Sequence, residues 1–261
     1  MCASLKKTGL NVITIANQKG GVGKTSSVIQ IASGLAKRGE KVLMSDGDPQ
    51  GNLTLFFGTK DKKDFGTLLS ALLEKSPIKP IEYINKNVRR NLDILPAKNK
   101  NLKIDIPDTD IAQANKAFSF FISSMKSHYD WILIDSSPSN SPLERLLVRS
   151  SDAVIIPLEF QLFSVSGLES ILDSVRVCSE EAGRDIIVHS LLFTKAENKL
   201  NRVNMYREHF STFHIPIYEI CKSEYMTRSL EKSRTIWECG PSSFAARDYA
   251  RVIEKGFLET V

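Results

Sequence analysis

The sequence lacks the features that mark several classes of protein. Its 261 residues include only four cysteines, which are scattered, form no Cys-x-x-Cys pair and have no histidine at metal-ligand spacing. This excludes a disulfide scaffold and a cysteine-based metal site, and it is typical of a reducing cytoplasm. No apolar run approaches the ~18 residues of a membrane-spanning helix. The first residues, "MCASLKKTGLN", contain no apolar run, so we expect no signal peptide.

What remains is a globular composition. Hydrophobic residues make up 42% of the chain and charged residues 25%, while 14 glycines and 10 prolines form no low-complexity tract. We see no linker or internal repeat, so residues 1–261 are expected to form a single domain. The net charge of +5 permits a polyanionic partner such as nucleic acid without requiring one.

Apolar runs alternate with helical patterns along the chain. Many of the runs are apolar throughout, which is typical of strands buried in a parallel sheet. The alternation predicts an α/β fold, a doubly wound, mostly parallel sheet flanked by helices, with ligands at the carboxyl ends of the strands. Strands are predicted at residues 11–16, 41–46, 92–97, 131–135, 153–159 and 185–194, and helices at 25–39, 65–75, 111–126, 164–183 and 203–210.

A glycine-rich stretch, "ANQKGGVGKTSS", follows the first strand and opens the first helix. Glycines there let backbone N–H groups close on a phosphate chain, and the helix amino end adds partial positive charge. Lys24 is placed to reach the β- and γ-phosphates, and the hydroxyl of Thr25 is placed to bind Mg²⁺. ATP and Mg²⁺ are therefore the expected cofactors. The expected nucleotide contacts are Gly20, Gly21, Val22, Gly23, Lys24, Thr25 and Ser26.

The motif departs from the usual GxxxxGK[ST] spacing, because Gln18 stands where the first glycine is expected and Lys19 follows it. This pattern resembles the deviant Walker A motif of the ParA/MinD superfamily of partition and positioning ATPases. The resemblance implies a P-loop NTPase fold, ATP hydrolysis and a homodimer that closes around two nucleotides. In that dimer Lys19 would reach the phosphates bound by the other subunit, where it would stabilise charge on the transferring phosphoryl group.

Two further segments resemble the same family. "DGDPQGN", after the second strand, matches the family's acidic motif, which implies that Asp48 orients the attacking water and that Asp46 supports Mg²⁺ through water. Taken alone, the segment is also typical of an acidic turn. "YDWILIDSSPS" resembles a Walker B strand, which implies that Asp135 joins the Mg²⁺ shell and that residues 136–138 sense the γ-phosphate.

The last third of the chain resembles the family less closely. Where relatives carry Ile-Pro-Arg/Lys-Asn near the adenine, this chain has Ile-Cys-Lys-Ser at residues 220–223. By resemblance, Cys221 and Lys222 are expected to contact the base. Glu159 and Gln161 occupy polar positions of the family segment after Walker B, and we assign them no role.

Basic residues gather in two stretches of the carboxyl-terminal part. In the ParA family, residues from these two regions form a surface that holds DNA nonspecifically, and ordinary solvated helix faces are the alternative interpretation. The expected DNA contacts are Lys195, Lys199, Arg202, Lys222 and Arg247.

The resemblance therefore predicts a small ParA-type ATPase of chromosome or plasmid partition, associated with the bacterial nucleoid. Its ATP-bound dimer would bind DNA without reading sequence, and a ParB-type centromere-binding partner would stimulate an otherwise weak hydrolysis. No amino-terminal helix-turn-helix domain and no membrane partner are expected. The alternative is a MinD-like or related positioning ATPase that acts on a membrane or a protein assembly.

Overall fold

The computed structural model describes residues 9–58, 63–97, 111–139, 141–160, 164–196 and 200–258. These residues form an eight-stranded sheet of order β3-β4-β2-β5-β1-β6-β7-β8. Every neighbouring pair is parallel except β3 and β4, which form an antiparallel edge. The strands are β1 (Val12–Ile15), β2 (Val42–Gly47), β3 (Asn85–Arg89), β4 (Leu92–Leu95), β5 (Trp131–Ser136), β6 (Ala153–Leu158), β7 (Ile187–Ala196) and β8 (Ile217–Cys221).

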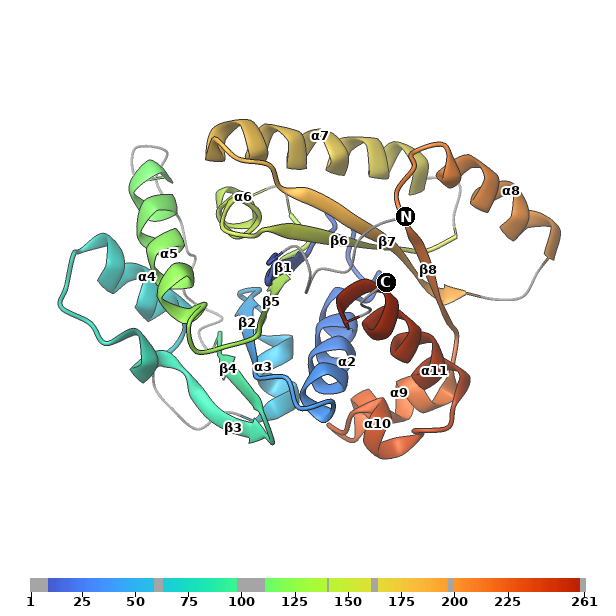
Figure 1. Cartoon of the computed structure of the whole chain (residues 1–261), viewed down its shortest axis with the longest axis horizontal. Helices are drawn as coiled ribbons and strands as arrows, with labels where there is room; N and C mark the ends of the chain where they lie inside the picture. The colour runs from blue at the N-terminus through green and yellow to red at the C-terminus, as the bar shows by residue number, and fades with distance from the viewer. Residues whose placement is uncertain are drawn as a thin grey trace.

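Helices cover both faces of this sheet, which confirms the predicted α/β fold (Figure 1). One face packs on α2 (Lys24–Lys37), α3 (Asn52–Phe57), α10 (Ile236–Cys239), α11 (Phe244–Arg251) and a π-helix, η3 (Val252–Leu258). The other face packs on α4 (Phe65–Leu73), α5 (Ile111–Met125), α6 (Pro142–Arg149), α7 (Ser164–Ala182) and α8 (Leu200–Ser211). A 3₁₀ turn, η1 (Pro80–Tyr83), precedes β3, and α9 (Glu224–Glu231) follows β8. None of the described helices is long and apolar enough to span a membrane.

The alternation of side chains along β1 explains this layering. Ile13 and Ile15 belong to the core beneath α2, whereas Val12 and Ala16 belong to the cores on the opposite face. A strand at the centre of a sheet that is covered on both sides is therefore mostly apolar, and the one polar residue of β1, Thr14, has its hydroxyl hydrogen-bonded to Ser151 and Leu147. The apolar segment that predicts β1 is therefore also consistent with the position of β1 in the middle of the sheet.

Helix α2 is buried nearly all round. Its predicted apolar stripe, which includes Val28, Ile31 and Leu35, faces the sheet. The polar Gln30 is buried as well, because α10 lies against the other side of the helix. The Gln30 side chain accepts a hydrogen bond from the backbone N–H of Ile236 at 2.9 Å, and its backbone carbonyl accepts one from the Trp237 indole at 2.8 Å.

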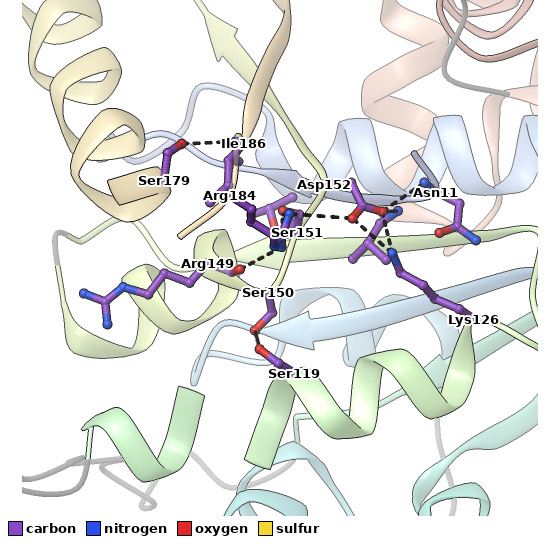
Figure 2. Close-up of polar contacts among 12 residues, drawn as sticks. Asn11, Ser119, Lys126, Arg149, Ser150, Ser151, Asp152, Ser179, Arg184 and Ile186 are labelled. Carbon is purple, nitrogen blue, oxygen red and sulfur yellow. Dashed lines mark hydrogen bonds and ion pairs between the residues drawn. The ribbon is translucent and has the colours of Figure 1, made fainter. Parts of the chain in front are cut away.

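The amino ends of the central strands are joined by a polar cluster around Asp152 (Figure 2). Its carboxylate accepts hydrogen bonds from the backbone N–H groups of Asn11 and Val12 at 3.1 and 3.0 Å and from the Lys126 ammonium at 2.9 Å. Arg184 donates to the carbonyl of Ser151 at 2.8 Å. This cluster holds β1 against β6 at the amino ends of the strands. The glycine-rich loop lies at the opposite, carboxyl ends, where ligands are expected.

Candidate nucleotide-binding site

The glycine-rich loop lies between β1 and α2 and is open where a phosphate chain would approach it. Gly21 and Gly23 have φ angles of 76° and 89°, a left-handed conformation that favours glycine. A Cβ on Gly20 or Gly21 would meet no atom within 4 Å, whereas a Cβ on Gly23 would lie 3.2 Å from the methyl group of Thr194. The first two glycines thus leave open space, and the third permits close packing against β7.

The amino end of α2 is suited to an anion. Its cap residue is Gly23, which offers no side-chain acceptor, and the first turn contains no acidic residue. The first N–H groups of a helix have no partner within the helix and carry the positive end of its dipole. Backbone groups of Lys24, Thr25 and Ser26 are therefore placed as the sequence predicts for phosphate contacts.

Lys24 is buried inside the loop, with 7% of its surface exposed. Its ammonium donates to the backbone carbonyls of Asn17 at 2.9 Å and Lys19 at 3.0 Å. Burial lowers the pKa of Lys24, and the nearby charges of Asp135, Glu144 and Asp48 act in the opposite direction. The side chain of Lys19, in contrast, is exposed on the outside of the loop.

Two aspartates meet beside the loop because β2 and β5 are neighbours in register, with Asp46 opposite Asp135. Both are fully buried. The Thr25 hydroxyl donates to one oxygen of Asp135 at 2.7 Å, and the other oxygen of Asp135 has no hydrogen-bond partner. Burial raises the pKa of Asp135 well above its usual range, and the charge of Asp46 adds to this rise.

The Asp46 carboxylate is already hydrogen-bonded by α3. One oxygen accepts from the backbone N–H of Thr54 at 2.8 Å and from its hydroxyl at 2.6 Å, and the other accepts from the N–H of Asp48 at 3.2 Å. Burial raises the pKa of Asp46 to about 7, against the effect of these hydrogen bonds. Its water-mediated role toward Mg²⁺ stays a prediction.

Asp48 lies in a tight turn just beyond β2. One carboxylate oxygen accepts from the N–H of Gln50 at 2.9 Å, and the Asp48 carbonyl accepts from Gly51 at 2.8 Å. The residue is 7% exposed, and its charge acts on Lys24. The acidic turn that the sequence permits is therefore present, and it carries Asp48 to the phosphate loop.

The residues around Thr25 fit a magnesium ion. Mg²⁺ takes oxygen ligands and usually keeps water and substrate phosphates in its shell. Thr25 supplies a hydroxyl, and Asp135 supplies an oxygen that lacks any donor. Within the described residues no three His, Cys, Asp or Glu side chains form a metal cluster. Water and phosphate oxygens are the ligands that would complete the shell of a Mg²⁺ ion held by Thr25 and Asp135.

The segment after β5 leads into α6. The Ser136 hydroxyl donates to the carbonyl of Ile15 at 3.1 Å, and the hydroxyls of Ser137 and Ser139 are 3.0 Å apart. Ser141 caps α6, because its side chain accepts from the N–H of Glu144. The segment predicted to sense the γ-phosphate therefore connects the Walker B strand to a capped helix.

Glu144 is a site residue that sequence reasoning missed. Its side chain is 6% exposed, and one carboxylate oxygen has no hydrogen-bond partner. Burial raises the pKa of Glu144 to about 7, and the Lys24 charge opposes that rise. In the sequence, Ser141 and Glu144 form the S-x-x-E pattern of a helix cap, so the pattern points to a structural role.

A cavity of about 360 Å³ adjoins the amino end of α2 and is suited to a base. Cys221 and Lys222, predicted as base contacts, line it together with Gly23, Ser26 and Met226. The backbone N–H of Cys221 donates to the Asp248 carboxylate at 3.0 Å. Burial and the Asp248 carboxylate raise the pKa of the Cys221 thiol to about 11.

Lys195, predicted as a DNA contact, lies against the phosphate loop. Its ammonium donates to the Gly21 carbonyl at 3.0 Å and pairs with Glu159 at 2.6 Å. Its backbone is left-handed, with φ of 55°. The preceding Thr194 donates through its hydroxyl to the Val22 carbonyl at 2.9 Å. The end of β7 thus holds two carbonyls of the loop.

The remaining predicted DNA residues are distributed unevenly. Arg247 is exposed on α11, where its guanidinium lies 4.4 Å from the ring centroid of Phe244. Lys199, like Gln161, lies outside the described residues. Arg202 is part of α8, and its side chain lies outside the description.

Comparisons with known proteins agree with this geometry. A family model described as an AAA domain matches residues 10–188. The chain is 30% identical to the sporulation initiation inhibitor protein Soj of Bacillus subtilis over 190 residues, which cover 73% of this chain and 74% of Soj. It is also 30% identical to the chromosome partitioning protein ParA of Myxococcus xanthus, over 73% of this chain and 66% of that protein.

A solved structure shows the same fold. The septum site-determining protein MinD of Pyrococcus horikoshii, in complex with Mg-ADP, superposes with a TM-score of 0.72 over 94% of both chains at 20% identity. The sequence matches, together with the phosphate loop and the paired aspartates, confirm the family that the motifs suggest. The chain belongs to the ParA/MinD family of ATPases.

Proposed function

We propose that this protein is an ATP-dependent DNA segregation ATPase that binds ATP and Mg²⁺ at the loop between β1 and α2. The observation that carries the proposal is the contrast between the two lysines of the loop. Lys24 is buried and bonded to the loop's own carbonyls, where it can exchange them for phosphate oxygens, whereas the side chain of Lys19 is exposed. Because its side chain is exposed, Lys19 can be reached by a nucleotide that a second subunit holds.

The residues of the site have separate roles in this proposal. The amide groups of α2 and the Lys24 ammonium hold the phosphates. Bound Mg²⁺, held through Thr25 and Asp135, would supply charge neutralisation at the β- and γ-phosphates. Asp48 orients the attacking water, and Lys19 from the other subunit stabilises the charge that develops during transfer.

A basic and aromatic surface near the base cavity supports DNA as the partner. Lys222 and Arg247 are exposed there, beside Phe244 at 71% and Tyr225 at 48% exposure. Cations interleaved with aromatic rings suit a nucleic acid backbone and its bases. The similar ParA protein is named for chromosome partitioning. Two such surfaces on one closed dimer act as a bivalent binder, so DNA affinity would depend on ATP.

The test is a comparison of DNA with membranes. DNA-coated beads and anionic liposomes would each be incubated with the protein in ATP and in ADP, and light scattering would report dimerisation in the same samples. We expect ATP-dependent binding to DNA, no recovery with liposomes, and a dimer only with ATP. Adding a ParB-type protein should accelerate ATP hydrolysis and release the DNA.

The salt dependence adds a quantitative check. Anisotropy across a salt series should give a slope of about −0.9 per phosphate neutralised in log–log form. Equal DNA binding with ADP and ATP would refute the nucleotide gate. ATP-dependent recovery with liposomes alone would favour a positioning ATPase that acts on membranes.

A further inference from the structure

We propose that a second cavity, at the carboxyl end of α2, binds a small ligand that carries two or more phosphate groups. The cavity has a volume of about 550 Å³ and lies between the end of α2, the β3–β4 hairpin and α10 (Figure 1). Helix α2 has 14 residues, so its two ends are roughly 20 Å apart at ~1.5 Å per residue. This cavity is therefore separate from the phosphate loop.

The cations that line the cavity come from two elements. Lys37 and Arg38 belong to the end of α2, where the helix dipole alone would favour them. Arg89 and Arg90 come from the hairpin and bring two further cations to the same cavity. Against these four cations the lining contains one carboxylate, that of Glu238. Glu238 pairs with Arg89, and Glu254, just outside the lining, pairs with Arg38, so the cations exceed the nearby carboxylates by two.

Two of the guanidinium groups are held in place by the surrounding chain. Arg38 donates to the Gly34 carbonyl at 3.0 Å and to Glu254 at 2.8 Å. Arg89 donates to the carbonyls of Val88 at 2.8 Å and Ser233 at 3.2 Å. Donors that are already oriented lose less conformational freedom when a ligand binds.

The other two cations are exposed. Lys37 and Arg90 are both exposed to solvent. Two cations held by hydrogen bonds and two exposed cations together suit a ligand that enters from solvent. Guanidinium groups match phosphate oxygens through paired hydrogen bonds.

A second feature of the cavity is an unpartnered hydroxyl in its wall. Ser33 lines the same cavity and is 8% exposed, and its hydroxyl has no hydrogen-bond partner. A buried polar group without a partner is unfavourable, and most such groups in proteins are satisfied. The hydroxyl oxygen is buried in the cavity wall, so a ligand oxygen would bond to it only after a small shift of the neighbouring side chains.

The size and shape of the cavity favour a small molecule. Ligand pockets typically have volumes of ~300–1,000 Å³. Four cations exceed the charge of a single phosphate, so a chain of phosphates matches them better. Trp237 also lines the cavity, with the Arg38 guanidinium 5.6 Å from its ring centroid. A ligand that draws Arg38 toward its phosphates would change the environment of this indole.

Trp237 therefore provides the measurement. The chain has two tryptophans, and the other, Trp131, is 1% exposed and packs against Phe257. The titration would use a Trp131→Phe, Lys24→Ala protein, so that fluorescence reports Trp237 alone and the phosphate loop does not compete. Inorganic tripolyphosphate would be added at constant ionic strength. A chain that keeps both tryptophans, compared with Trp237→Phe, gives the same signal without the core substitution.

We expect a saturable change in fluorescence that Lys37→Gln and Arg90→Gln each weaken by at least tenfold. Lys86→Gln, an exposed change on the same hairpin outside the cavity, should leave the titration unchanged. UTP carries the same chain of three phosphates as tripolyphosphate. If UTP binds more tightly, the ligand is a nucleotide, and if the two bind equally, the ligand is an inorganic phosphate chain. A response that is absent, that survives Arg90→Gln, or that only duplex DNA produces would overturn the proposal.

Discussion

For Asp48, a role in the backbone is visible in the structure, and a role in the chemistry is predicted. It closes a turn through Gln50 and Gly51, and its charge acts on Lys24. The sequence identifies the residue through its motif, but spacing alone does not separate the two roles. A substitution can separate them, because a turn residue affects stability and a water-orienting residue affects turnover.

We predict that Asp48→Ala retains ATP binding and lowers hydrolysis by about 10²- to 10⁴-fold, the usual contribution of a positioned base. The ATP-bound dimer should then accumulate. Calorimetry with ATP, phosphate release and gel filtration would measure the three effects. A lower melting temperature with unchanged turnover would instead assign Asp48 to the turn alone.

Lys195 is predicted to act on nucleotide affinity as well as on DNA. Lys195→Met removes the donor to the Gly21 carbonyl and the pair with Glu159, so the phosphate loop loses an external tie. We expect ATP affinity to fall by about threefold to tenfold, the size of one hydrogen bond. Titration calorimetry would show this, and Lys195→Arg should restore most of the affinity. If Lys195→Met kept its ATP affinity and lost DNA binding, Lys195 would act on DNA alone.

The sequence predicts most of the candidate nucleotide site and only part of its surroundings. Lys24, Thr25 and Asp135 can be predicted, and the structure places them close together, because their motifs encode strand, loop and helix together. Glu144 is hidden, because its spacing from Ser141 is that of a common helix cap. Its burial beside Lys24 arises from packing of α6 against the sheet, which no local pattern records.

At the scale of elements, central strands are predictable and edge elements are not. The strand predictions for residues 11–16 and 131–135 correspond to β1 and β5, since strands buried on both faces are mostly apolar. The edge strand β8 is only half-buried along most of its length, so its pattern is weak. Helices α9 and α10 are short, and tertiary packing rather than periodicity determines them.

The contact between β7 and η3 provides a pH-dependent prediction. His189 is 2% exposed and packs against Phe257. Burial lowers its pKa to about 4, and a hydrogen bond with the Gly256 backbone opposes this. The unfolded chain, with a pKa of about 6.5, binds more protons between pH 6.5 and 4. The stability that neutral His189 contributes is therefore complete above pH 6.5 and is lost as the pH falls toward 4.

We expect this loss to reach about 2 kcal/mol between pH 6.5 and 4.5. Urea unfolding at a series of pH values would measure it for the parent and for His189→Gln, whose stability should fall less on acidification. His128→Gln, at an exposed histidine, is the control and should keep the parent's pH dependence. Parallel curves for all three proteins would show that His189 titrates normally.

At the scale of the whole molecule, Lys19 is predicted to make dimer formation depend on ATP binding. Lys19→Ala should leave ATP binding to the single subunit within about threefold, because the side chain is exposed, whereas Lys24 is buried inside the loop. Dimerisation and ATP-dependent DNA binding should both disappear. Lys24→Ala is the matched comparison and should lose ATP binding itself, since a charge-assisted contact to phosphate is removed. Light scattering and calorimetry would separate the two lysines, and a Lys19→Ala dimer that still binds DNA would contradict the link.

The bonds from the Lys24 ammonium to the carbonyls of Asn17 and Lys19 also bear on how quickly the loop accepts a ligand. With no anion present, the lysine itself serves as a template around which the loop keeps its curvature. When a nucleotide enters, its phosphate oxygens replace the two carbonyls as hydrogen-bond partners of the Lys24 ammonium. The loop is already ordered in the folded protein, so binding loses little further conformational entropy. Association should accordingly be fast and single-phased, and discrimination among ligands should be expressed mainly in their residence times.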